Sequence, residues 1–352
     1  MTWTLEQLFD IVVSMHGSDI CFVPGAPPVI WVAGHMVQLD LPPLDPSAID
    51  ATFLPLLSED LRRTLDAAGD LDFSLGQNEV GRLRVNLHRQ RGTLSATIRY
   101  IPYEVPKFEN LKLPRRLLGL ADLPRGLVLV TGGAGTGKST TLASMVHYMN
   151  QVYAYHIITL EDPIEFTFKH GRSVIEQREI GVDCPSFSAA LRHVVRQRPD
   201  VILVGEMRDL ETISAALTAA ETGHLVLASL HTANAVETIS RIVDVFPGPQ
   251  QAQVRVQLSD TIQGVACQTL FHDEVDGTMV PAVEIMVATP AIRRAIRDNE
   301  THLLHGMIET GKSLGMQTMD NAIADLARAR RISASDAMAK CQNPEKLAKL
   351  IA

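Results

Sequence analysis

The chain of 352 residues is poor in cysteine, in aromatic residues and in long apolar runs. Cys21, Cys184, Cys267 and Cys341 lie far apart and form no C-x-x-C pair, so the sequence predicts neither a zinc site nor a disulfide framework. No apolar run approaches the length of a membrane span, and the start MTWTLEQLFD lacks the basic and apolar regions of a secretory leader. We therefore expect a cytoplasmic protein whose cysteines are reduced.

The chain also has fewer basic than acidic residues. The chain has 32 Lys and Arg against 40 Asp and Glu, a formal net charge of -8, and only 5% aromatic residues. Because single-stranded nucleic acid is bound by basic grooves interleaved with aromatic side chains, this composition argues against a nucleic-acid translocase. Hydrophobic residues make up 46% of the chain, which is ordinary for a globular protein, and the length is sufficient for two domains.

The chain does contain a complete phosphate-binding motif. The segment GLVLVTGGAGTGKSTT begins at Gly126, combines a short apolar strand with the pattern G-x-x-x-x-G-K-[ST], and opens a helix. Its glycines let backbone N–H groups surround a phosphate, and the helix dipole favours an anion. Lys138 is predicted to reach the β- and γ-phosphates of ATP, and Ser139 to bind Mg²⁺. The predicted nucleotide-binding residues are Gly132, Gly133, Ala134, Gly135, Thr136, Gly137, Lys138, Ser139 and Thr140.

Acidic side chains follow further apolar strands. These strands are predicted at His156 to Leu160, Val201 to Val204 and Leu225 to Leu230. Ligands of parallel sheets gather beyond the carboxyl ends of the strands, so the residues after each strand are candidates for the site. Glu206 is predicted to orient or deprotonate water, and Glu161 and Asp162 to hold Mg²⁺ directly or through water.

Histidines and arginines are candidates on weaker grounds. His224 and His231 stand before and after the third of these strands, where a structural role explains them equally well. The run GRLRVNLHRQRGTLSATIRY alternates apolar with basic residues, which predicts a strand with one basic face. One explanation is that this face is simply exposed to solvent. The other is that the protein forms a ring of subunits, in which Arg84, Arg91 and Arg99 approach the nucleotide of a neighbouring subunit and stabilise the transferring phosphoryl group.

The order of the predicted elements indicates two domains. A helix from Thr4 to Met15, short strands, a helical segment from about Pro46 to Ala68 and the arginine-rich strand predict a small α+β domain over residues 1–101. Prolines mark residues 102–122 as an interdomain linker. Residues 123–352 alternate strands with helices, which predicts a mostly parallel sheet covered by helices.

With these motifs assembled, the sequence resembles the secretion-superfamily ATPases, and most closely the type IV pilus retraction ATPases of the PilT type. The resemblance covers nearly the whole chain. It rests on a Walker A segment at Gly132–Thr140, an Asp box at Thr159–Glu165, a Walker B segment at Pro199–Asp209 and a His box at Thr222–Thr232. It implies a PAS-like N-terminal α+β domain, a RecA-like P-loop NTPase domain with a helical C-terminal part, and a homo-hexameric ring.

The resemblance also implies functional residues. The family's Walker B and Asp-box glutamates correspond to Glu206 and Glu161, and its His-box histidines to His224 and His231. Its arginines near the nucleotide are matched to Arg84, Arg91 and Arg99.

A C-terminal segment is similar to a motif that distinguishes retraction ATPases from their relatives. It reads AIRRAIRD from Ala291 to Asp298. We expect an amphipathic helix there, with an apolar face and with its three arginines outside that face. The expected apolar face consists of Ala291, Ile292, Ala295 and Ile296.

The function that the resemblance implies is an ATP-hydrolysing hexameric motor for pilus retraction and twitching motility. Such a motor would be cytoplasmic and peripheral at the inner membrane, where its partners would be a pilus platform protein and a paralogous retraction ATPase. The alternatives that remain open are an accessory retraction ATPase, a DotB-like ATPase of type IV secretion, and a nucleotide-gated binding subunit without catalysis.

Overall fold

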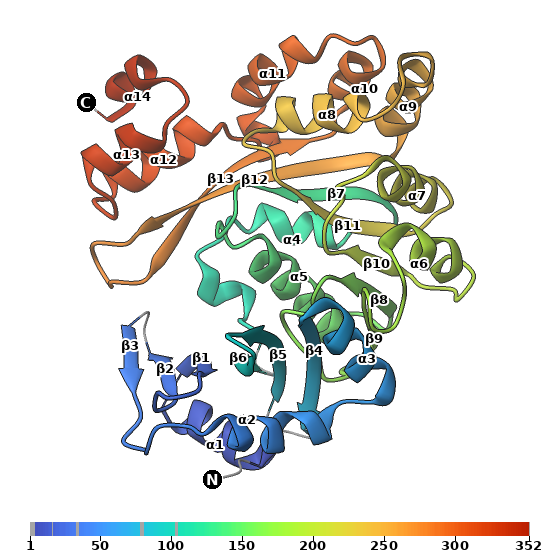
Figure 1. The fold of residues 1–352 in the computed structure, drawn as a ribbon. Coiled ribbons are helices and arrows are strands. Elements are labelled where there is room, and N and C mark those ends of the chain that lie inside the picture. The colour runs from blue at the N-terminus through green and yellow to red at the C-terminus, as the bar shows by residue number, and fades with distance from the viewer. Residues whose placement is uncertain (1–3, 16, 33–34, 78–80, 103–104, 352) are drawn as a thin grey trace. The chain divides into compact units, whose positions relative to one another are not determined.

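The computed structural model describes the chain except for residues 1–3, 16, 33–34, 78–80, 103–104 and 352 (Figure 1). The chain divides into two compact units, Met1–Glu104 and Val105–Ala352, and each mixes helices with strands. Two residues of the predicted linker, Tyr103 and Glu104, lie outside the described residues.

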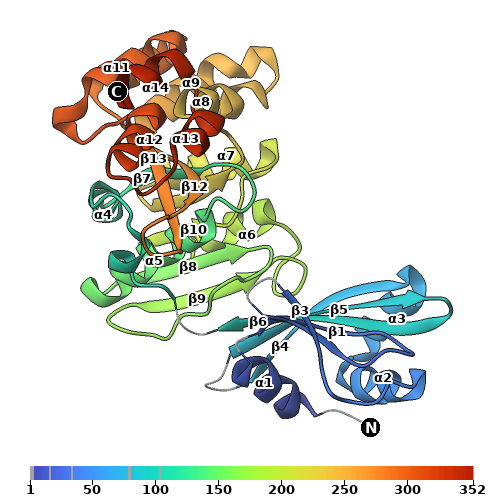
Figure 2. The same ribbon diagram turned by 90° about the vertical axis from the view of Figure 1, so that its left-hand side faces the viewer.

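The first unit is built on a six-stranded antiparallel sheet in the order β3-β2-β1-β6-β5-β4 (Figure 2). Its elements are α1 (Leu5–Ser14), β1 (Gly17–Phe22), β2 (Val29–Val32), β3 (His35–Gln38), α2 (Pro46–Phe53), η1 (Leu54–Leu56), α3 (Glu59–Ala68), β4 (Asp70–Gln77), β5 (Gly81–Gln90) and β6 (Thr93–Pro102). On β5, Leu83, Val85 and Leu87 are buried and share one core with residues of α1, α2 and α3. Arg84 and Asn86, which alternate with them, therefore lie on the opposite face of the sheet.

The helical segment predicted from Pro46 to Ala68 is interrupted. Helix α2 ends at Phe53, the short 3-10 helix η1 contains Pro55, and α3 begins at Glu59. Proline offers no backbone N–H to continue a helix, and the Ser58 hydroxyl accepts the N–H of Leu61 at 3.3 Å as the cap of a new one. The prediction of one segment was wrong because both sides of the break have helical periodicity.

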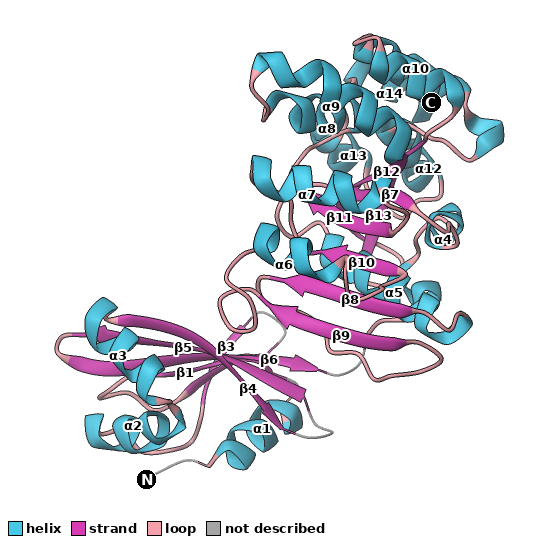
Figure 3. Cartoon of the chain, turned by 90° about the vertical axis from the view of Figure 1, so that its right-hand side faces the viewer, coloured by secondary structure: helices cyan, strands magenta, loops and turns pink. Residues whose placement is uncertain are grey.

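The second unit contains a seven-stranded sheet in the order β13-β12-β7-β11-β10-β8-β9 (Figure 3). Its elements are η2 (Phe108–Leu111), α4 (Arg116–Ala121), β7 (Gly126–Thr131), α5 (Lys138–Val152), β8 (His156–Glu161), β9 (Val174–Glu179), α6 (Phe187–Val194), β10 (Val201–Val204), α7 (Leu210–Glu221), β11 (Leu225–Leu230), α8 (Ala235–Asp244), α9 (Gly248–Thr261), β12 (Ile262–His272), β13 (Met279–Val287), α10 (Pro290–Arg297), η3 (Thr301–Leu303), α11 (Leu304–Thr310), η4 (Lys312–Leu314), α12 (Met319–Arg328), α13 (Ala334–Lys340) and α14 (Pro344–Ile351).

Six strands of this sheet are parallel, and only the pair β12 and β13 is antiparallel among the described residues. The strand of the phosphate-binding motif and the three predicted strands correspond to β7, β8, β10 and β11, which form the centre of the sheet. Strands β9, β12 and β13 were not predicted. The core on one face includes α4 and α5, and the core on the other includes α6 to α10 and the C-terminal helices.

Helix α10 covers the segment AIRRAIRD. Its buried residues are Ile292, Ala295 and Ile296, as predicted. Ala291 is exposed, so the apolar face is narrower than expected. Arg293 is partly buried, and its guanidinium donates to the carbonyl oxygens of Ser259 and Asp260 at 2.7 and 3.0 Å, close to the end of α9. Arg293 therefore stabilises the C-terminal end of α9, a contact that the amphipathic pattern did not predict.

The buried carboxylate of Glu284 on β13 joins two helices at their first residues. Its Oε1 accepts the N–H of Ala235 at 2.7 Å and its Oε2 accepts the N–H of Met319 at 3.3 Å. These N–H groups begin α8 and α12, where no helical carbonyl is available to them. Burial raises the pKa of Glu284, although both N–H groups favour its ionised form. Figure 2 shows α12, α13 and α14 close together near the C terminus.

Replacing this carboxylate should destabilise the second unit. In Glu284→Gln, an NH₂ group replaces one acceptor and leaves one buried helix N–H unpaired, so we expect a loss of about 1–3 kcal/mol in the free energy of unfolding. Urea denaturation followed by circular dichroism would measure it. Glu274→Gln, at an exposed carboxylate, is the matched control. Equal stability of the two variants would contradict the role given to Glu284.

Candidate active site

The phosphate-binding loop follows β7, whose six residues are all buried. Gly132 has φ 146°, and a Cβ there would lie 2.4 Å from the carbonyl oxygen of Gln268, so only glycine fits at this position. Gly137, at φ 84°, turns the chain into α5, which begins at Lys138. The motif is therefore held between two strands and the amino end of a helix, which is the arrangement expected of an anion site.

Lys138 lies folded over this loop. Its Nζ donates to the carbonyl oxygens of Gly132 at 3.0 Å and Gly133 at 2.9 Å, and the residue is 8% exposed. Burial lowers the pKa of Lys138 from its usual value, against the opposing charges of Glu206 and Glu165. Hydrogen bonds from an ammonium group to phosphate oxygens are stronger than those to neutral carbonyls, so a bound phosphate would compete for Nζ.

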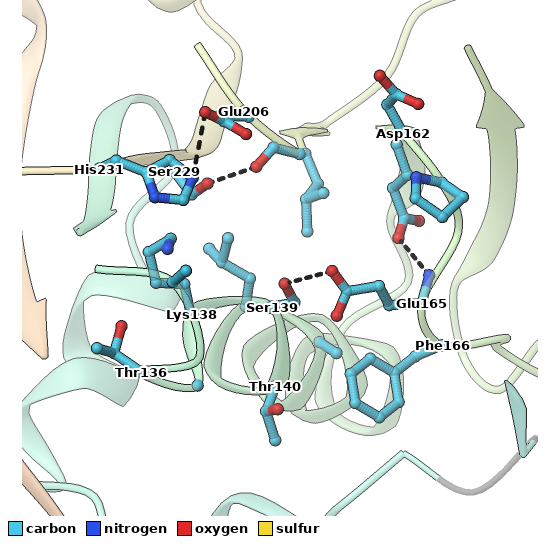
Figure 4. A pocket seen from close by; sticks show the side chains of 18 of the residues that line it. Thr136, Lys138, Ser139, Thr140, Asp162, Glu165, Phe166, Glu206, Ser229 and His231 are labelled. Atoms are coloured by element: carbon cyan, nitrogen blue, oxygen red, sulfur yellow. Dashed lines mark hydrogen bonds and ion pairs between the residues drawn. The ribbon is translucent and has the colours of Figure 1, made fainter. Parts of the chain in front are cut away.

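A cleft of about 520 Å³ opens above the loop within the second unit (Figure 4). Its lining includes residues from Ala134 to Thr140, together with acids from the ends of β8 and β10 and a histidine from the end of β11. The predicted site residues outside the loop that line it are Glu161, Asp162, Glu206 and His231. Three strand ends and the loop thus meet at one carboxyl edge of the sheet, as the sequence predicted.

Glu206 lies between an arginine and a histidine side chain. Its Oε2 lies 2.6 Å from a guanidinium nitrogen of Arg208, and its Oε1 lies 3.2 Å from Nε2 of His231. Burial acts to raise the pKa of Glu206, but the hydrogen bond from Arg208 and the charge of His231 outweigh it, so the pKa lies below the usual range. The carboxylate is therefore ionised at neutral pH and can accept a hydrogen bond from water.

Glu161 has a different environment. Its Oε1 accepts the hydroxyl of Thr159 at 2.7 Å and the amide of Gln177 at 3.1 Å, and its Oε2 accepts the N–H of Glu165 at 3.4 Å. Burial raises the pKa of Glu161 despite these donors. Both carboxylate oxygens are thus engaged, Oε1 by side chains of β8 and β9 and Oε2 by the turn that follows β8. Asp162, the next residue, is exposed in the same cleft.

Glu165 forms a hydrogen bond with Ser139 that the sequence did not predict. The Ser139 hydroxyl donates to Glu165 Oε1 at 2.9 Å (Figure 4). Glu165 lies in the same acidic turn as Glu161, so the sequence carried a signal for it, but one strand end offered three carboxylates and no means of ranking them. Other cleft residues without a prediction include Phe166, Phe168, Phe187, Arg208, Ser229 and Leu270.

The two histidines of the predicted His box lie at opposite ends of β11. His224 precedes the strand, and its Nδ1 lies 2.9 Å from the carbonyl oxygen of Ala219. The rise of an extended chain separates it from His231 by about 23 Å. His231 lines the cleft and His224 does not.

The three predicted arginines belong to the first unit, and the structure brings two of them together. Arg84 and Arg99 are directly paired across β5 and β6, so they lie on one face of the sheet. Arg99 forms an ion pair with Asp19 at 2.8 Å. Arg91 stands in the turn between the strands with φ 49°, about 24 Å along the ribbon from Arg84.

Comparisons with known proteins agree with the motifs. A family model described as Type II/IV secretion system protein matches residues 108–278. The type IV pilus retraction ATPase PilT of Pseudomonas aeruginosa is 43% identical over 341 residues, covering 97% of this chain and 99% of its own. The type IV pilus ATPase PilU of that organism is 36% identical over 98% of this chain and 91% of its own.

A solved structure is similar over both units. The crystal structure of the pilus retraction motor PilT with bound ADP matches with a TM-score of 0.92 at 43% identity, covering 99% of either chain. The resemblance drawn from the motifs and the predicted α/β fold with a RecA-like ATPase domain are thereby confirmed.

Removal of the Lys138 ammonium should weaken nucleotide binding. In Lys138→Ala, phosphate oxygens lose a charged donor in a mostly buried position, so we expect an at least about tenfold weaker affinity for ATP. Titration with a fluorescent ATP analogue would measure it. Lys349→Ala, at an exposed lysine of α14, is the control and should bind normally. Unchanged affinity in Lys138→Ala would contradict this use of the loop.

Proposed function

Because the chain belongs to the PilT family of type II/IV secretion ATPases, we propose that it is an ATP-hydrolysing motor that powers type IV pilus retraction. The observation that carries this proposal is the match to PilT along nearly the full length of both chains. A shared nucleotide-binding domain alone would support only an ATPase, since function resides in more than a fold.

We infer that the loop and α5 hold the phosphates of ATP and that oxygen ligands beside them hold Mg²⁺. The Ser139 hydroxyl, Asp162 and Glu165 are hard oxygen donors at the same cleft, which is the donor set that Mg²⁺ prefers alongside phosphate oxygens. Bound Mg²⁺ would neutralise charge on the β- and γ-phosphates. Glu161 would act indirectly, because its oxygens already accept three hydrogen bonds, one of them from the backbone of the acidic turn.

Glu206 is proposed to orient the attacking water. The water oxygen forms a bond to the γ-phosphorus, the bond from that phosphorus to the β,γ-bridging oxygen breaks, and a water proton passes to Glu206. Arg208 and His231 hold the carboxylate in position and keep it ionised beforehand. The products are ADP and phosphate.

The chain is proposed to work as a homo-hexameric ring in which the first unit of one subunit contributes to the nucleotide site of another. The cross-strand pairing supports Arg84 and Arg99 as the pair that stabilises the phosphoryl group. Arg91 stands too far along the ribbon to act on the same phosphate with them, and a separate contact in the ring is the role we infer for it. His224, at the other end of β11 from the cleft, is likewise assigned to a contact between subunits.

The partner on which the motor acts is proposed to be an inner-membrane pilus platform protein, with the motor peripheral to that membrane. Among the described residues, no helix is long and apolar enough to cross a membrane. An accessory role beside another retraction ATPase is the second candidate, supported by the similarity to PilU over 98% of this chain.

Loss of the Glu206 carboxylate should separate binding from hydrolysis. Glu206→Gln keeps the shape of the side chain but cannot take the proton, so we expect ATP affinity to be retained and turnover to fall by at least about a hundredfold. Phosphate release and analogue titration on the same preparation would test both. Glu221→Gln, at an exposed glutamate, serves as the control. Normal turnover in Glu206→Gln would rule out this mechanism.

Retraction itself is tested in cells. The gene is deleted, and the deletion strain is complemented with the wild-type or the Glu206→Gln allele. We expect only the wild-type allele to restore motility, whereas the deletion strain and the Glu206→Gln strain should both keep surface pili. Twitching zones and sheared pilin would report the two quantities. Loss of protein export with normal motility would instead favour a secretion ATPase, and a partial loss of motility would favour the accessory role.

A further inference from the structure

Four buried side chains form a polar network beneath the cleft, among the core residues that pack against α8. They are Thr131, Thr232, Thr238 and Cys267, and none is more than 4% exposed. We refer to them as the hydroxyl network. The Thr131 hydroxyl donates to Cys267 Sγ at 2.9 Å, Cys267 is hydrogen-bonded to Thr238, and Thr232 and Thr238 hydroxyls lie 2.6 Å apart.

The hydrogens of this network can be assigned in one consistent way. The Thr238 hydroxyl donates to the carbonyl oxygen of Asn234 at 2.7 Å, so towards Thr232 it is the acceptor and Thr232 is the donor. Burial raises the pKa of Cys267, which keeps its S–H available to donate to Thr238. Each hydroxyl and the thiol thus has an acceptor for its hydrogen, as buried polar groups require.

The network ends at the two chain segments that carry the chemistry. Thr131 immediately precedes Gly132 of the phosphate-binding loop, and Thr232 immediately follows His231. His231 is 45% exposed at its side chain, and within the described part of the chain Glu206 is its only ion-pair or hydrogen-bond partner. The direction of its ring therefore depends on how firmly the backbone beside it is held.

The backbone between β11 and α8 is held by side chains. The N–H of Ala233 donates to Glu237 at 2.9 Å, and the Asn234 side chain accepts the N–H of Glu237 at 2.8 Å. Both contacts lie beyond Thr232, whose buried hydroxyl is the nearest side-chain anchor on the C-terminal side of His231. On the other side, the carbonyl oxygen of Leu230 accepts the N–H of Gly132 at 3.3 Å. Thr238, one turn into α8, is the other half of that anchor.

We propose that Thr232 and Thr238 are positioning residues for ATP hydrolysis: their hydroxyl pair fixes the backbone that aims His231 at Glu206. The proposal rests on the proposed role of Glu206 as the residue that orients water. Without the pair, His231 moves away from the carboxylate while the phosphate-binding loop keeps its own contacts.

The expected signature lies in the pH dependence of hydrolysis. The charged or titratable groups around Glu206 are Arg208 on its own loop, His231 after β11, Lys138 on α5 and, beyond Arg208, Asp162 after β8. His231 and Arg208 together hold the pKa of Glu206 low against burial. When His231 withdraws, the pKa of Glu206 rises, so activity is lost at a higher pH as the solution is acidified.

The test compares Thr232→Val with Thr232→Ser in the full chain. Valine keeps the shape and removes the hydroxyl, whereas serine keeps the hydroxyl. We expect Thr232→Val to lower kcat at least about tenfold and to move the acidic limb of the pH profile upward, with ADP-analogue affinity unchanged. Thr232→Ser should stay within about threefold of wild type. Thr261→Val, at another buried threonine, controls for loss of a buried hydroxyl and should keep the wild-type profile.

A double mutant decides between positioning and general stability. If Thr232 acts through His231, Thr232→Val should have no further effect on kcat in a His231→Ala background. An equal loss in both backgrounds, or a wild-type pH profile in Thr232→Val, would overturn the proposal. Should Thr232→Val fail to fold, Thr238→Val and Thr238→Ser take the place of the two Thr232 variants in the same experiment. Normal turnover in Glu206→Gln would remove the proposed function itself, a result separate from any outcome at Thr232.

Discussion

The constraint on which the site depends is the burial of β7 between β11 and β12. All six residues of this strand are buried, and parallel pairs on both sides fix its register against the neighbouring strands. A strand that cannot shift delivers Gly132 to one point, where the carbonyl oxygen of Gln268 leaves no room for a Cβ. The packing of the sheet thus determines where the phosphate-binding loop lies, and the residues of the loop determine how the chain turns there.

The carboxylates at the same sheet edge differ in environment, and this divides the work among them. Glu206 lies between Arg208 and His231, which lower its pKa, whereas burial raises the pKa of Glu161. An ionised carboxylate with access to the cleft suits the orientation of water. A carboxylate whose oxygens already accept hydrogen bonds suits the shaping of a turn, which leaves Glu165 beside Ser139. Identical residue types therefore acquire separate roles from their surroundings.

The sequence predicted the central strands and the meeting of Lys138, Glu161 and Glu206 at one edge, because apolar runs and strand-end acids are local signals that a parallel sheet converts into proximity. It did not predict β12, which supplies Gln268 and Cys267, because Gln263, Gly264 and Gln268 interrupt its apolar residues and leave no long apolar run. Hydrogen-bond partners such as Ser139 and Glu165 also escaped it. Their pairing depends on where side chains point after the turn, which spacing alone does not determine.

Glu284 ties this local chemistry to the C-terminal helices. One carboxylate accepts the first N–H of α8, the helix that follows His231, and the first N–H of α12. A displacement of either helix must lengthen one of two buried hydrogen bonds or move β13, and both alternatives cost free energy in a close-packed core. The segment beside Glu206 and the C-terminal helices therefore share one anchor.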